Sequence, residues 1–126
     1  MKKLVKPIVH LKIPIYAGHI SICESIEAAK SYFKNIDFEH YGDDYNGLTI
    51  KAFGNNGSLS VIIIFDDIDN IPFHVISHES IHAAWAVLDN SGIKPSYDNQ
   101  EVLTYLSDWV VKEVFRIKEM RRILNN

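Results

Sequence analysis

Residues 61–65 read Val61-Ile62-Ile63-Ile64-Phe65 and are all apolar. Successive side chains of a strand point to opposite faces of its sheet, so a run without polar residues is typical of a strand buried on both faces. We therefore expect residues 59–65 to form the buried central strand of a sheet. The turn signal Gly54-Asn55-Asn56-Gly57 precedes this run and predicts a hairpin with a strand over residues 48–53.

The N-terminal half contains signs of two further strands and one helix. Apolar residues nearly alternate from 8 to 16, where Pro14 suggests an edge position, and a short strand is expected at 19–23. From 24 to 34 the apolar residues fall on one helical face, with no Gly or Pro between them. This half is therefore expected to form a small twisted sheet of about four strands with one helix.

The C-terminal half carries helical patterns. One helix is expected to have Asp69 or Asn70 as its cap, with Pro72 in its first turn, and to end at Asn90-Ser91-Gly92. Asp98 and Glu101 have the spacing of a capping box at the start of a second helix, which reaches about Arg122. The expected fold is therefore α+β, with the sheet followed by two long antiparallel helices, in a single domain of residues 1–126.

Composition restricts the class of protein. The chain has 126 residues, of which 47% are hydrophobic, and this is enough for one modest core. No apolar stretch approaches the length of a membrane span, and Pro7 and His10 interrupt the lysine-rich start before a signal-peptide core forms. Cys23 is the only cysteine, so no internal disulfide is expected. We expect a cytoplasmic protein with no membrane or nucleic-acid partner, because the net charge is only −3 and no basic patch is interleaved with aromatic residues.

The segment His78-Glu79-Ser80-Ile81-His82 points most directly to a chemistry. On a helix, a spacing of four residues puts His78 and His82 one turn apart on the same face, so both rings can reach one metal ion. Glu79 projects beside them and can take a proton from metal-bound water. His74 lies two turns from His82, about 12 Å along the axis, which is too far for one shared ion. The motif therefore predicts a zinc-binding helix with Glu79 as the general base.

Two histidines make only half of a metal site, and Glu101 is the candidate for a third ligand. It lies 19 residues beyond His82, in the first turn of the next expected helix. His78, His82 and Glu101 would bind Zn²⁺ through two nitrogens and one oxygen and leave the fourth position for water. Glu101 also has a purely structural interpretation, as the reciprocal partner in the capping box.

The motif and the downstream glutamate resemble the zincin metallopeptidases, specifically the gluzincin branch, in which that glutamate is the third zinc ligand. In thermolysin-like members this glutamate follows an asparagine and precedes an aspartate by one turn, whereas this chain has Asn99-Gln100-Glu101 and carries Tyr105 in place of the aspartate. The wider pattern is more similar to short zincin-like proteins encoded by tailed phages and prophages. It comprises Pro14-Ile15-Tyr16-Ala17-Gly18, the histidine motif, Glu101, Tyr105-Leu106 and Trp109.

The leading interpretation is a small zinc metallopeptidase that cleaves a peptide or protein substrate, with Glu79 as the base. Two other classes stay open: a metal-binding phage or prophage protein that acts on a host partner by binding, without peptidase activity, and a zincin-like hydrolase of a non-peptide bond. Asp108 is a candidate partner for a zinc-bound histidine, and the hydroxyl of Tyr97 or Tyr105 is a candidate for stabilising an oxyanion. The sequence does not indicate the substrate or the oligomeric state.

Overall fold

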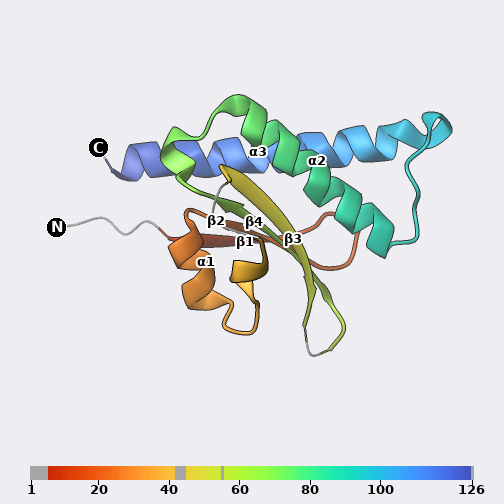
Figure 1. Ribbon diagram of the computed structural model, residues 1–126. Helices are drawn as coiled ribbons and strands as arrows, with labels where there is room; N and C mark the ends of the chain where they lie inside the picture. Colours follow the sequence, from red (N-terminus) through yellow and green to blue (C-terminus); the bar gives the residue numbers. More distant parts are fainter. Residues whose placement is uncertain (1–5, 42–44, 55, 126) are drawn as a thin grey trace.

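The computed structural model describes residues 6–41, 45–54 and 56–125, and these form an α+β fold with one sheet of four strands. The N-terminal half contains strands β1 (Ile8–Lys12), β2 (His19–Cys23), β3 (Gly47–Phe53) and β4 (Leu59–Phe65), and the short helix α1 (Ile26–Tyr32). The C-terminal half contains the long helices α2 (Phe73–Asn90) and α3 (Gln100–Leu124) (Figure 1). The connections contain the 3₁₀ helices η1 (Phe38–Tyr41), η2 (Ile68–Asn70) and η3 (Tyr97–Asn99).

Strand β4 has a neighbour on each side, as its apolar sequence predicts. The strand order is β1-β2-β4-β3, in which β4 is parallel to β2 and antiparallel to β3, and β2 is antiparallel to β1. β3 and β4 form the expected hairpin, although Asn55 of its turn lies outside the described residues. The edge strand β1 ends at Lys12, before the expected end at residue 16, because Pro14 offers no amide donor and Ile15 turns the chain with a φ of 62°.

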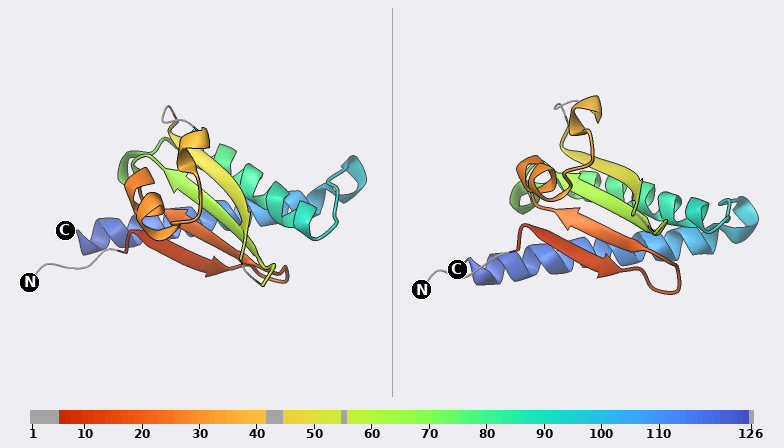
Figure 2. Two further views of the ribbon diagram at one scale, coloured as in Figure 1. Left: turned by 60° about the horizontal axis from the view of Figure 1, so that its bottom comes forward. Right: turned by 90° about the horizontal axis from the view of Figure 1, so that it is seen from below.

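Helices cover both faces of the sheet, and each face has its own core (Figure 2). α2 and α3 pack on the face that carries Val61, Ile63 and Phe65. α1 and η1 lie over the opposite face, which carries Ile62 and Ile64. All five of these side chains are 0% exposed. Full burial of a side chain of this size stabilises the fold by about 1.5–3 kcal/mol, so β4 contributes to the stability of both layers.

Helix α2 ends where its sequence indicates, but it starts after Pro72, because the expected cap residues Asp69 and Asn70 belong to η2. Pro72 is the N-cap residue, where its missing amide hydrogen removes no helical hydrogen bond. The helix ends at Asn90, and Gly92 turns the chain away with a φ of 75°. Ala83 and Ala84 are fully buried, and these small side chains allow α2 to lie close to its neighbours.

Helix α3 starts differently from the prediction. A capping box precedes it, in which the amide nitrogen of Ser96 donates to the side-chain oxygen of Asn99 at 2.6 Å, so Asp98 and Glu101 do not form it. The buried side of α3 follows the expected periodicity, with Leu106, Val110, Val114 and Ile117 in the core. Across the described part of the chain, neither this helix nor any other combines the length and apolar character needed to cross a membrane.

Arg121, near the end of α3, ties this helix to two connections of the fold. It is 8% exposed, and its Nε and Nη2 each donate to the carboxylate of Asp69 at 2.8 Å. Its Nη1 lies 2.7 Å from Oε2 of Glu24, between β2 and α1. The hydrogen bond from Arg121 is the main reason that the pKa of Asp69 lies below its ordinary value. The ion pairs therefore join α3 to η2 and to the β2–α1 connection.

We expect Arg121→Ala to lower the free energy of unfolding by about 1.5–3 kcal/mol, because charge-assisted hydrogen bonds from a mostly buried guanidinium are lost. Arg122→Ala is the matched control, since Arg122 pairs with Glu119 on the surface and such pairs contribute little. Urea denaturation of the two variants measures the difference. Equal losses in both would contradict a special role for Arg121.

Candidate metal centre

Helix α2 brings the two histidines of the motif together on its solvent-facing side. The Nε2 atoms of His78 and His82 are 3.1 Å apart, and their ring centroids are 4.7 Å apart. The opposite side of α2 packs Ile76, Ala83 and Val87 into the core. This amphipathic arrangement leaves both rings open to solvent, and the side chain of His78 is 67% exposed.

The separation of the two nitrogens is close to that of two ligands of one zinc ion. Zinc–nitrogen bonds of about 2.0–2.1 Å at a tetrahedral angle place the two nitrogens about 3.3–3.4 Å apart. The 3.1 Å between His78 and His82 is within about 0.3 Å of that separation. The same distance also suits a hydrogen bond from one ring N–H to the other ring nitrogen. The distance alone is therefore compatible with both a shared zinc ion and a direct hydrogen bond.

Glu79 lies beside the histidines, but its side chain is buried against β3 and only 7% exposed. The hydroxyl of Thr49 on β3 donates to Oε1 of Glu79 at 2.7 Å. The other carboxylate oxygen, Oε2, lies 3.8 Å from Nε2 of His78. A buried carboxylate is unfavourable unless it is paired or hydrogen-bonded, and here one oxygen is bound by the sheet. The second oxygen is the one closer to the histidines.

Gly47, the first residue of β3, permits the close approach of the strand to α2. A Cβ at this position would lie 2.8 Å from Cγ of Glu79 and 2.9 Å from Cγ1 of Val75, well inside the usual separation of carbon atoms. A hollow of about 360 Å³ opens here, and it is lined by Asn46, Gly47, His74, Val75, His78 and Glu79. His74 is thus part of the wall beside the histidine pair.

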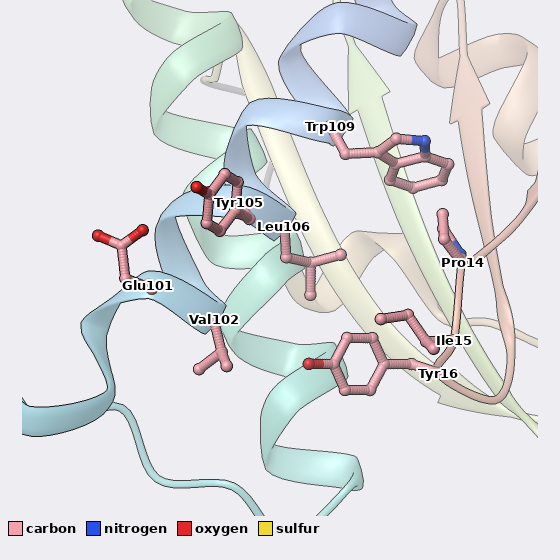
Figure 3. Close-up of a pocket in the computed structure, with 8 residues that line it drawn as sticks. All are labelled: Pro14, Ile15, Tyr16, Glu101, Val102, Tyr105, Leu106 and Trp109. Atoms are coloured by element: carbon pink, nitrogen blue, oxygen red, sulfur yellow. The ribbon is translucent and has the colours of Figure 1, made fainter.

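Glu101 lies apart from the histidines. It is exposed in the first turn of α3, on the rim of an apolar cavity of about 380 Å³ between α3 and the turn that joins β1 to β2. Figure 3 shows Leu106 and Trp109 facing Pro14–Tyr16 across this cavity, while the carboxylate of Glu101 points away from it. Among the residues that the structure describes, no three His, Cys, Asp or Glu side chains are grouped closely enough to hold a metal ion. Ligation of zinc by Glu101 stays a prediction.

Three further residues with predicted roles lie on the surface. Tyr97 and Tyr105 are both exposed. Asp108 makes an ion pair with Lys112 one turn further along α3, at 3.0 Å. The structure therefore gives Asp108 a lysine partner, and the roles proposed for it and for the two tyrosines stay predictions.

Thr49 and Gly47 contact Glu79, and the sequence patterns do not single them out. Both belong to the side of β3 that faces α2, in register with Ile63 and Phe65 of β4. The available signal was the polar Thr49 between its apolar neighbours Leu48 and Ile50, on the side of β3 where Gly47 lies against α2. Its contact with Glu79 joins residues 30 positions apart, which periodicity within one element does not reveal.

Comparisons with known proteins give no relatives. No family model matches the sequence, no curated protein matches it, and no solved structure matches the fold.

We expect Gly47→Ala to lower the free energy of unfolding by about 1–3 kcal/mol, because the added methyl group pushes β3 away from Glu79 and Val75. Gly54→Ala is the control in the same hairpin, where the nearest atoms to an added Cβ are side-chain oxygens at 3.3 Å. Thermal and urea unfolding of both variants measure the effect. If the variant at position 47 is as stable as the control, the close packing of Gly47 is not required.

Proposed function

We propose that this protein is a zinc-dependent metallohydrolase and, within that class, a small metallopeptidase. The observation that carries the proposal is the pair of histidine nitrogens 3.1 Å apart, with a buried carboxylate oxygen 3.8 Å from one of them. Two imidazole ligands and an adjacent carboxylate base are part of what hydrolysis by a zinc-activated water requires, and a third protein ligand completes it. The resemblance of the motif to that of the zincins supports the same function.

Each side chain has a separate role in this proposal. His78 and His82 bind Zn²⁺ through their Nε2 atoms, and zinc held there supplies Lewis acidity to water and to the substrate carbonyl. Glu79 accepts the proton of the attacking water. The water oxygen bonds to the carbonyl carbon, the C–N bond breaks, and Glu79 passes its proton to the leaving nitrogen. The hollow beside His78 gives a substrate access to the same carboxylate.

Glu101 completes the proposed zincin-like arrangement, in which α2 and α3 together carry the metal site. Its carboxylate is exposed and lies at the start of α3. Because it is not grouped with the histidines, binding of the same ion requires the first turn of α3 to move toward α2. A shift of this kind at a helix terminus is less costly than a shift in the buried stripe of α3, since fewer packed contacts change.

A second candidate function is a metal-binding protein that acts on a partner by binding, without hydrolysis. Ile81 and Trp85 favour it, because both lie on the solvent side of α2 next to the histidines and are 46% and 49% exposed. Large apolar side chains beside a metal site are suited to contact with another protein.

The first test is zinc binding. At a zinc concentration 100 times Kd, we expect wild type to gain about 2.7 kcal/mol of stability. His78→Ala and His82→Ala should each lose most of this gain, while His74→Ala, the control on the same helix, keeps it. Calorimetric titration with zinc and thermal unfolding measure both quantities. Unaltered zinc binding in the two histidine variants would remove the metal-site proposal, and unaltered binding in Glu101→Gln would remove Glu101 from the ligands.

The second test is turnover of a proteome-derived peptide library by zinc-loaded protein. We expect Glu79→Gln to keep its zinc and to lose at least about 100-fold in kcat, the usual contribution of a general base. Mass spectrometry of the products, alongside metal analysis, measures both. Equal turnover in wild type and variant would rule out the role of Glu79. Stoichiometric zinc without any cleavage by wild type would favour the binding function.

A further inference from the structure

Thr49 stands out on the face of β3 that packs against α2. It pairs in register with Ile63, which is fully buried in the core beneath α2. A valine would suit such a strand position by shape and by strand propensity. The hydroxyl of Thr49 instead meets the buried carboxylate of Glu79. We infer that Thr49 is a positioning residue for the general base, and this inference rests on the proposed hydrolytic function.

The two possible acceptors of the Thr49 hydroxyl are not equivalent. Its Oγ1 lies 2.7 Å from Oε1 of Glu79 and 3.3 Å from the backbone oxygen of the same residue. A hydroxyl has a single proton to donate, and the shorter contact with a charged acceptor takes it. Oε1 is therefore occupied by the sheet, and Oε2 is the oxygen left for chemistry.

The remainder of the Glu79 side chain is restricted by packing. The backbone of β3 at Gly47 passes so close to Cγ of Glu79 that even a methyl group would not fit between them. The carboxylate is thus held on one side by Gly47 and on another by the Thr49 hydroxyl, with Oε2 3.8 Å from Nε2 of His78. Rotation of this mostly buried carboxylate would break its hydrogen bond with Thr49, which is unfavourable.

The two carboxylate oxygens of Glu79 therefore have different roles: Oε1 accepts the hydrogen bond from Thr49, and Oε2 transfers the proton. Oε2 takes the proton of the attacking water and later gives it to the leaving nitrogen, while the proton of Thr49 stays on Oγ1 throughout. Loss of the Thr49 hydroxyl leaves Oε1 without its partner, so the carboxylate is no longer fixed in the orientation that aims Oε2 at the water. Misplacement of a catalytic group lowers kcat with little effect on binding of the substrate.

Thr49→Val and Thr49→Ser test this inference, because valine keeps the shape without the hydroxyl and serine keeps the hydroxyl without the methyl group. In peptide hydrolysis by zinc-loaded protein, we expect Thr49→Val to lower kcat by about 10- to 100-fold. KM and zinc affinity should change less than about twofold. Thr49→Ser should recover most of the lost kcat. An undiminished kcat in Thr49→Val, or an equal loss in Thr49→Ser, would overturn the positioning role.

A second measurement needs no turnover and separates failure of this inference from failure of the proposed function. Thr49→Val should lower the urea midpoint of wild type, because it leaves Oε1 of Glu79 unpaired. In a Glu79→Met background, which has no carboxylate, the same substitution should leave the midpoint unchanged or raise it. Equal losses in both backgrounds would overturn the Thr49–Glu79 contact. If Thr49→Val lowers the urea midpoint only when Glu79 is present, the Thr49–Glu79 contact is supported. If the zinc-loaded wild type nevertheless cleaves no peptide, the contact stands and the hydrolytic function is overturned.

Discussion

The rest of the structure depends on the burial of β4 on both of its faces. Its alternate side chains point into two separate cores, so the sheet needs a layer of helix on each side. The short helix α1 and η1 cover one face of the sheet, and the two long helices α2 and α3 cover the opposite face (Figure 2). Helix α2 must therefore lie close to β3 and β4, and its two fully buried alanines permit this approach. Packing alone thus brings the histidine motif beside the edge strand β3.

The motif is divided by this packing into an exposed part and a buried part. The two histidines face solvent, where a metal ion and a substrate have access, while Glu79 faces Gly47 and Thr49 of β3. A carboxylate in a nearly dry position is less favourable for stability than an apolar side chain of similar volume. The hydrogen bond from Thr49 offsets part of this cost. A carboxylate oxygen 3.8 Å from Nε2 of His78 is consistent with the proposed transfer of a proton from water.

Much of the fold can be predicted from local sequence patterns, because the spacing of apolar residues shows which side of each strand or helix is buried. The apolar run of β4, the hairpin before it and the periodicity of α2 and α3 predict the elements and their buried sides. Prediction is less successful where contacts join separate elements. The capping box of Ser96 and Asn99 begins η3, which precedes α3, and Ser96 has the extended conformation that suits a cap. The spacing of Asp98 and Glu101 does not report this backbone geometry. We expected Glu101 to lie near His82 because both helices were expected to face each other. The position of the first turn of α3 depends on how α2 and α3 cross, and sequence spacing does not give this angle.

A crystal structure of the zinc-loaded protein, with anomalous diffraction data at the zinc edge, decides whether His78 and His82 bind one zinc ion. We predict one strong peak about 2.0–2.1 Å from Nε2 of both His78 and His82, with the carboxylate of Glu79 next to it. Such a map also identifies the third ligand, whether Glu101 or another group. A fully loaded crystal with no peak between the two histidines, or with zinc bound elsewhere, would rule out a zinc site at His78 and His82.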